Sequence, residues 1–220
     1  MQKKILVLGD SHSRVFRKVC FRTPSTSYTF EVIDVSGATA SGLENPNSRT
    51  NAYGIFSAAL QSIEHDLVVT MLGEVDTGFV IWYRSQTLGI PLADSFAITY
   101  DRYCRFVEEL GAKVAVISAP LPTIRDNQDW GEIANLRRAV TATQQQRTAL
   151  TIEFNSLMQS YCSSRSIPYL NLDQSVLGHD GRLRAEYYAS DPNDHHYAEA
   201  VFARLLEDNL GSIFRPTGSE

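Results

Sequence analysis

Two stretches near opposite ends of the chain carry the residue types of nucleophilic acyl chemistry. The first is a Gly-Asp-Ser triplet that ends at Ser11 and directly follows four apolar residues, and the second is 190–197, which holds two of the five histidines and two aspartates. Acyl transfer needs a nucleophile, a base oriented by a third group, and N–H donors for the oxyanion. Ser11 can be the nucleophile, and an imidazole beside a carboxylate can be the base. The candidate bases and orienting groups are His195, His196, Asp191 and Asp194.

Each stretch also has a purely structural explanation. Asp10, Ser11 or Ser13 can cap the helix expected after the first strand, because short polar side chains accept the free N–H groups of a first helical turn. An aspartate in 190–197 can cap the last helix, with two solvated histidines after it. A metal site is a third possibility, but two adjacent histidines cannot easily ligate one ion, and no cysteine or third histidine is placed to help.

The elements that must position these residues alternate between strand and helix along the whole chain. The apolar and aliphatic runs predict five strands, at 5–8, 28–35, 66–72, 113–118 and 167–172. The helical patterns lie at 14–21, 51–63, 93–110, 130–163 (one helix or two) and 197–210, while the aromatic segment 77–91 is hard to assign. Such alternation predicts a parallel sheet covered on both faces and joined by right-handed crossovers. We therefore expect a three-layer α/β/α fold with a flavodoxin-like five-stranded sheet.

Small or acidic residues follow the first three predicted strands. They are Gly9-Asp10-Ser11, the segment 36–39 and the segment 73–76. Because the carboxyl ends of parallel strands lie side by side, these segments should converge on one crevice. Gly37 can bring a backbone N–H close to a ligand, since glycine has no Cβ in the way, although a plain loop glycine is an equal alternative.

Length and composition limit the classes of protein to consider. The chain has 220 residues, a net charge of −5 and a pI near 5.6, so we expect one domain over 1–214 with a tail at 215–220, and no nucleic-acid partner. No segment approaches the ~20 apolar residues of a membrane span, and the apolar run after Lys4 is too short for a signal peptide, which favours a soluble, cytoplasmic protein. Three cysteines, all in predicted helices, are expected to be reduced and partly buried. The oligomeric state stays open.

Taken together and in order, these segments resemble the four sequence blocks of the SGNH (GDSL) hydrolases. The blocks are Gly9-Asp10-Ser11, Ser36-Gly37-Ala38-Thr39, a Gly-x-x-Asp motif ending at Asp76, and the Asp/His pair before the last helix. The resemblance implies a flavodoxin-like fold and ester hydrolysis through an acyl-serine intermediate, with no metal or organic cofactor. It implies that Ser11 is nucleophile and oxyanion donor, that Gly37 is the second donor, and that the Asp/His pair completes the triad. A small-molecule ester or an acylated glycan is the expected substrate.

The chain departs from the family pattern in the third block. Val75 stands where the family has the Asn that supplies a third oxyanion donor, and losing one such donor typically lowers the rate by ~10²–10³. Glu74 and Asp76 are expected to organise the site, and Arg84, or the neighbouring Trp-Tyr pair, could replace the missing donor. A subgroup with Gly-Asp-Ser-His and Gly-Glu-x-Asp motifs is similar to this chain. The predicted oxyanion and substrate-binding set is Gly37, Asp10, Glu74, Asp76 and Arg84.

The fourth block also departs, since the Asp-x-x-His spacing of the family fits neither histidine. We favour His196 as base, because the apolar stripe of the following helix fits a helix that starts just after it, and Asp194 as its orienting group. His195 and Asp191 remain competitors. Two other functions stay open: a binding or scaffold protein that keeps the fold but has weakened catalysis, and an O-acyltransferase.

Overall fold

The computed structural model describes residues 1–126, 140–191 and 193–214. Its centre is a five-stranded sheet with the order β2-β1-β3-β4-β5, in which every neighbouring pair is parallel. The strands are β1 (Gln2–Gly9), β2 (Ser27–Asp34), β3 (Leu67–Met71), β4 (Val114–Ile117) and β5 (Tyr169–Leu170). The predicted flavodoxin-like, three-layer fold is confirmed.

β1 shows why the sheet is covered on both sides. Its last aliphatic residues are all buried, and their side chains alternate between faces as strand geometry requires. Ile5 and Val7 belong to one hydrophobic cluster, whereas Leu6 and Leu8 belong to the other. An unbroken apolar run in the sequence is therefore the signature of a strand between two layers.

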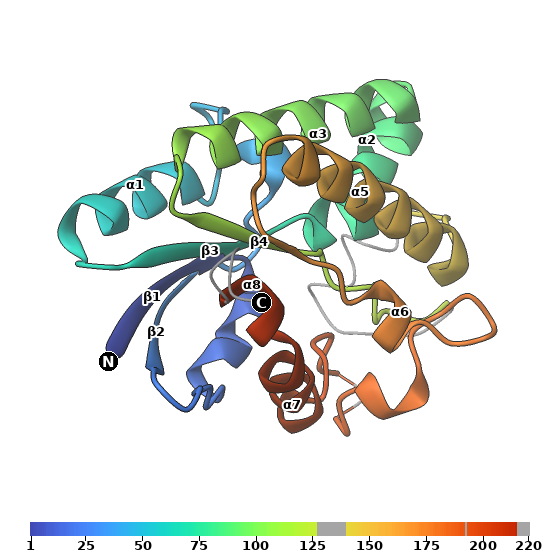
Figure 1. Ribbon diagram of the computed structural model, residues 1–220. Coiled ribbons are helices and arrows are strands. Elements are labelled where there is room, and N and C mark those ends of the chain that lie inside the picture. The colour runs from blue at the N-terminus through green and yellow to red at the C-terminus, as the bar shows by residue number, and fades with distance from the viewer. Residues whose placement is uncertain (127–139, 192, 215–220) are drawn as a thin grey trace.

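Helices cover the two faces of the sheet in separate groups (Figure 1). One group is α1 (Ala52–Ser62), α3 (Leu92–Glu109) and α5 (Gln144–Ser164), whose Phe56, Phe106 and Phe154 pack in the cluster of Leu6 and Leu8. The other group is η1 (Ser11–Arg17), α7 (Glu199–Asn209) and α8 (Gly211–Phe214), whose Phe16, Phe202 and Ile213 pack in the cluster of Ile5 and Val7. Short elements complete the chain: η2 (Ala40–Gly42), α2 (Ile81–Leu88), α6 (Asp173–Val176) and η4 (Ala185–Tyr187).

The segment after β1 differs from the prediction. Instead of a helix over 14–21, it forms the 3-10 helix η1, which begins at Ser11 because the carboxylate of Asp10 caps it by accepting the N–H of His12. Cys20 consequently lies outside any helix and is exposed, contrary to expectation. Cys104 and Cys162 lie in helices and are buried free thiols.

Two other segments are now placed. The aromatic segment after β3 forms a π-helix, η3 (Asp76–Val80), followed by α2, which ends at Gly89 with a left-handed φ of 68°. The helix predicted over 130–163 is α5, which begins at Gln144 because Thr143 caps it with a capping box. Residues 127–139 and the predicted tail at 215–220 lie outside the described residues. Within the described chain, no helix combines the length and the apolar character that crossing a membrane requires.

Candidate active site

Ser11 lies where β1 ends, as the first residue of η1. The polar groups of Asp10 fix this turn: its carboxylate accepts the N–H of His12 at 2.9 Å, and its carbonyl accepts the N–H of Ser13 at 3.0 Å. Gly9 permits the close approach of β3, since a Cβ there would lie 2.6 Å from the carbonyl oxygen of Met71. Asp10 is completely buried, and its carboxylate caps η1 by accepting the N–H of His12.

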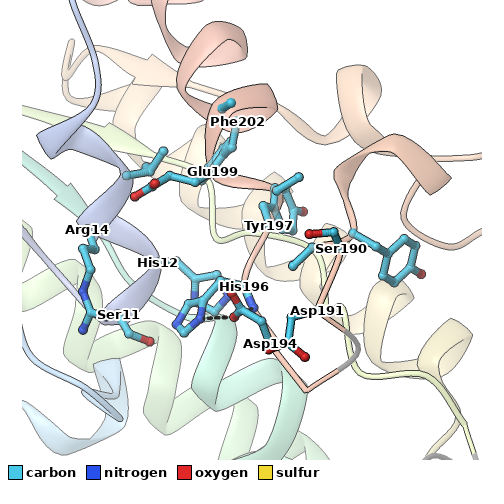
Figure 2. A pocket seen from close by; sticks show the side chains of 15 residues that line it. Ser11, His12, Arg14, Ser190, Asp191, Asp194, His196, Tyr197, Glu199 and Phe202 are labelled. Atoms are coloured by element: carbon cyan, nitrogen blue, oxygen red, sulfur yellow. Dashed lines mark hydrogen bonds and ion pairs between the residues drawn. The ribbon is translucent and has the colours of Figure 1, made fainter.

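His196 and Asp194 form a hydrogen-bonded pair on the loop before α7. Asp194 Oδ1 lies 2.7 Å from His196 Nδ1 and accepts the backbone N–H of the same histidine at 2.9 Å. Figure 2 shows the contact between the Asp194 carboxylate and the His196 ring as a dashed line, near Ser11. A proton on Nδ1 is needed to donate to the carboxylate, which leaves Nε2 as the basic nitrogen. Among the described residues, none hydrogen-bonds to Nε2 of His196.

A cavity of about 510 Å³ brings the two ends of the chain together. Its wall includes Ser11 and Arg14 from η1, and Asp191, Asp194 and His196 from the loop (Figure 2). Its apolar part is lined by Val15, Ala189, Ala198 and Phe202. The hydrogen bonds found within the described ranges do not include one between Ser11 Oγ and His196 Nε2. The cavity is within the usual range for small-molecule sites.

The surroundings of the pair bias it toward a neutral imidazole and an ionised carboxylate. Burial lowers the pKa of His196, and the positive charge of His12 lowers it further, against the opposing effect of Asp194. Partial burial pushes the pKa of Asp194 upward, but the hydrogen bonds from His196 outweigh it, and the net change is downward. A neutral imidazole with an ionised partner is the state that can accept a proton from an alcohol.

The other two candidates on this loop have different surroundings. Asp191 is exposed, and its carboxylate accepts the N–H of Asn193 at 2.8 Å, with no hydrogen bond to a histidine among the described residues. The ring of His195 lies beside that of His196, with centroids 4.2 Å apart. The carbonyl of His195 accepts a hydrogen bond from the hydroxyl of Thr123.

The loop is anchored to the segment that follows β4. Besides the contact of Thr123, the buried hydroxyl of Tyr197 accepts the N–H of Leu121 at 2.7 Å. Because Leu121 and Thr123 lie in the buried segment that follows β4, these bonds hold the loop of His196 against that segment.

The third block connects to the second one. The buried carboxylate of Asp76 accepts the N–H groups of Ala40 at 2.7 Å and Ser41 at 3.1 Å. Burial raises the pKa of Asp76 to about 6, although these hydrogen bonds and the charge of Arg84 oppose the change. Asp76 therefore holds the loop after β2 against the helical segment after β3.

Gly37 and Arg84 do not line the cavity. Gly37 is exposed on the turn after β2 with a φ of 72°, and Arg84 is half-buried on α2. Neither residue lines the cavity that Ser11 and His196 share. Val75 is half-buried between the two acidic residues of the block. The predicted roles of Gly37 and Arg84 in binding the oxyanion stay predictions.

No role was predicted from the sequence for His12, which lies between Asp10 and Glu74 in this region. His12 is buried, with Nδ1 at 3.2 Å from Asp10 Oδ1 and 3.9 Å from Glu74 Oε2. Its ring centroid lies 5.0 Å from that of His196. A third histidine thus lies beside the adjacent pair, although its donor atoms are not in the group of Asp194, His195 and His196 that could hold an ion. The sequence signal was the unusual histidine directly after the nucleophile candidate.

The histidine cluster bears on the question of a metal ion. Donor atoms of Asp194, His195 and His196 lie within 4.8 Å of one another, which is near the spacing that a cation would need. However, the hydrogen bond at 2.7 Å between Asp194 and His196 satisfies these two residues with each other. We read the arrangement as an acid–imidazole pair rather than an ion site.

The comparisons with known proteins agree with this architecture. No family model and no curated protein matches the chain. Solved structures do: the aryl esterase of M. smegmatis is 20% identical with a TM-score of 0.52, and the match covers 96% of this chain and 100% of that one. An acetyl xylan esterase is 13% identical with a TM-score of 0.56 and the same coverage of 96% and 100%. A GDSL-like lipase from Bacteroides thetaiotaomicron is 15% identical with a TM-score of 0.52, covering 94% of this chain and 85% of the lipase.

At these identities the likeness concerns the fold. The sheet order and the two helical layers described above are those of a three-layer α/β/α protein. The chain thus has the fold of GDSL-like lipases and esterases, the fold that its four sequence blocks implied.

Proposed function

We propose that the chain is a serine-dependent ester hydrolase of the SGNH (GDSL) type. One observation carries the proposal: Ser11 lines the same cavity as the Asp194–His196 pair. The serine and the histidine are 185 positions apart in the sequence. The resemblance of the sequence blocks and the likeness to solved esterases support it. The residues present are those that acyl transfer requires.

The geometry suggests the following sequence of steps. His196 Nε2 takes the proton of the Ser11 hydroxyl as Oγ attacks the ester carbonyl carbon. The tetrahedral intermediate collapses when the alkoxide leaves with the proton from His196, and an acyl-serine remains. Water then attacks the acyl carbon with His196 again as base, which releases the acid and restores Ser11. Asp194 holds the imidazole in the required tautomer and stabilises its charged form.

The oxyanion needs N–H donors at the ends of the first two strands. We assign one to the backbone of Ser11, at the start of η1, where the first N–H groups of a helical turn lack internal partners. We assign the second to the N–H of Gly37, on the turn that follows β2. Since Val75 supplies no side-chain donor, we expect catalysis to be slower than in a site with three donors, by the ~10²–10³ typical of one missing donor.

Short acyl esters of a small alcohol or a carbohydrate are the proposed substrates. The volume of about 510 Å³ and the mixture of apolar and charged lining suit a small acyl group on a polar alcohol. The acetyl xylan esterase of similar fold points to the same class.

The decisive experiment is the Ser11→Ala substitution, assayed with p-nitrophenyl acetate. Turnover should fall to the level without enzyme, and a sulfonyl fluoride should add one mass label to the wild-type protein and none to the variant. Ser160→Ala, an exposed serine on α5, is the matched control and should keep full activity and labelling. Unchanged turnover in Ser11→Ala would exclude the mechanism.

A non-catalytic binding protein is the second candidate. It is favoured by Val75 and by the lack of a hydrogen bond between Ser11 Oγ and His196 Nε2 among the described residues. A wild-type protein that neither hydrolyses short esters nor reacts with the sulfonyl fluoride would support it. An acyltransferase would instead move the acyl group to an added sugar alcohol faster than to water, which product analysis would show.

A further inference from the structure

A buried charge cluster lies directly behind the proposed base. The side chains of Asp10, His12 and Glu74 are at most 2% exposed. Nδ1 of His12 faces both carboxylates, at 3.2 Å from Asp10 Oδ1 and 3.9 Å from Glu74 Oε2. None of the three residues has a place in the steps written above.

Charge compensation determines the state of this cluster. Two ionised carboxylates buried near one neutral imidazole would leave two negative charges with little solvent, which is strongly unfavourable. A second proton on the His12 ring places a positive charge within 4 Å of both carboxylates. The net charge of the cluster then changes from −2 to −1. The cluster therefore favours an imidazolium at position 12.

The cluster is in contact with His196. The centroids of the His12 and His196 rings lie 5.0 Å apart with an angle of 55° between the planes. Tyr197, the next residue of the loop, also meets the His12 ring edge-on at 6.4 Å. A fixed positive charge at this distance opposes a second one on His196, while packing against the same ring limits where His196 can move.

We propose that His12, held between Asp10 and Glu74, is a positioning residue that carries a permanent proton and keeps the neighbouring His196 neutral and directed at the cavity. The inference rests on the proposed function for the role of His196 as base. The contact between His12 and Glu74 explains both the histidine next to the proposed nucleophile and the acidic residue in the third block.

Several other charged groups face His196 and must be weighed with His12. Those that line the same cavity or act on the His196 ring are Arg14, Glu74, Asp191, Asp194, His195, Tyr197 and Glu199. Burial and His12 lower the pKa of His196, whereas Asp194 and Glu74 raise it, and the net change is downward. Removal of the His12 charge should therefore move the titration of His196 upward.

The test is an NMR titration of the histidine side chains, which needs no substrate. The chain has five histidines, so the His12→Gln and His196→Gln variants assign the two relevant signals. In the wild-type protein, the ring nitrogens of His12 should both keep their protons from about pH 5 to 8, while His196 titrates. In His12→Gln, the midpoint of His196 should rise by about one pH unit, and the acid limb of kcat/KM should rise with it.

His65→Gln is the matched control for His12→Gln. His65 is half-buried just before β3, at the opposite end of the strands, and its ring contacts the carbonyl of Ile63. This change should leave the midpoint of His196 where it is. A structural role for His12 alone would lower stability but would not move that midpoint.

Two results would overturn the inference: a neutral His12 ring at pH 7 in the wild-type protein, or an unchanged His196 midpoint in His12→Gln. If His12→Gln does not fold, the wild-type titration alone decides. The NMR signals report the protonation of His12 and His196 without any substrate. The turnover of Ser11→Ala tests the proposed chemistry separately, so the failure of one proposal can be told from the failure of the other.

Discussion

The orienting carboxylate can be identified by comparing two conservative changes on one loop. Asp194→Asn keeps the size of the side chain but removes the negative charge that meets His196 Nδ1 at 2.7 Å. In the Ser-His-Asp triad of serine proteases, the equivalent change of Asp to Asn lowers kcat ~10⁴-fold. The side chain of Asp194 is 44% exposed, so water can replace part of the lost interaction. We therefore expect a smaller loss of about 10²–10³ in kcat/KM, which is about 3–4 kcal/mol of barrier.

Stability should change far less than activity in this variant. A hydrogen bond between a partly exposed carboxylate and a neutral imidazole contributes only about 1 kcal/mol to folding. The pKa of Asp194 is lowered in the folded protein, so its contribution is present above the unfolded value and is lost as the pH falls through the folded value. Asp194→Asn should also move the acid limb of kcat/KM to lower pH, because the carboxylate raises the pKa of His196.

Asp191→Asn is the control, with the same chemical change three positions earlier. Its carboxylate accepts the N–H of Asn193 and stabilises the turn, so activity should fall less than about threefold. The assay is kcat/KM on p-nitrophenyl acetate across pH, with thermal melting of each variant. An Asp191→Asn variant that loses as much activity as Asp194→Asn, at unchanged stability, would refute the assignment.

Three further outcomes follow from the described contacts. Cys20 should react with a thiol reagent in the native protein, while the two buried thiols, whose pKa burial raises, react only in denaturant. Tyr197→Phe should lower the free energy of unfolding by about 1–3 kcal/mol, measured with urea, because the buried N–H of Leu121 loses its acceptor. Burial raises the pKa of Asp76 from 3.8 to about 6, so the folded protein favours the protonated carboxyl. The stability that this preference contributes is therefore lost as the pH rises from about 4 to 6. The wild-type protein should therefore lose Tm relative to Asp76→Asn over that range.

The fold was predictable because β1, β3 and β4 each contain a run of buried residues. Four consecutive aliphatic residues before Gly9 can be accommodated only where two layers share them, as the split of Ile5 and Leu6 between two clusters shows. The element ends were less predictable. The cap by Asp10 selects a tight 3-10 turn at Ser11, and this depends on one side-chain hydrogen bond rather than on periodicity.

The site was predictable in its parts but not in its pairing. Spacing alone left two histidines and two aspartates on one loop. The structure distinguishes them because the backbone turn lets Asp194 bind both the N–H and the ring of His196, while Asp191 binds the N–H of Asn193. The loop is also held by hydrogen bonds from Leu121 and Thr123 in the distant segment after β4, and no local sequence pattern contains these bonds.

His12 in the first block and Glu74 in the third are best understood as one structural feature. His12 extends the first block and Glu74 precedes the position of the missing Asn in the third, 62 residues later. The pairing of β1 with β3 places Gly9 opposite Met71, which brings the segments that follow both strands together. There the imidazole and the carboxylate lie 3.9 Å apart in a buried site, where either one alone would be unfavourable. A histidine at position 12 is therefore stabilised by an acid such as Glu74 near it, and replacing one of the two residues should lower stability more than replacing both.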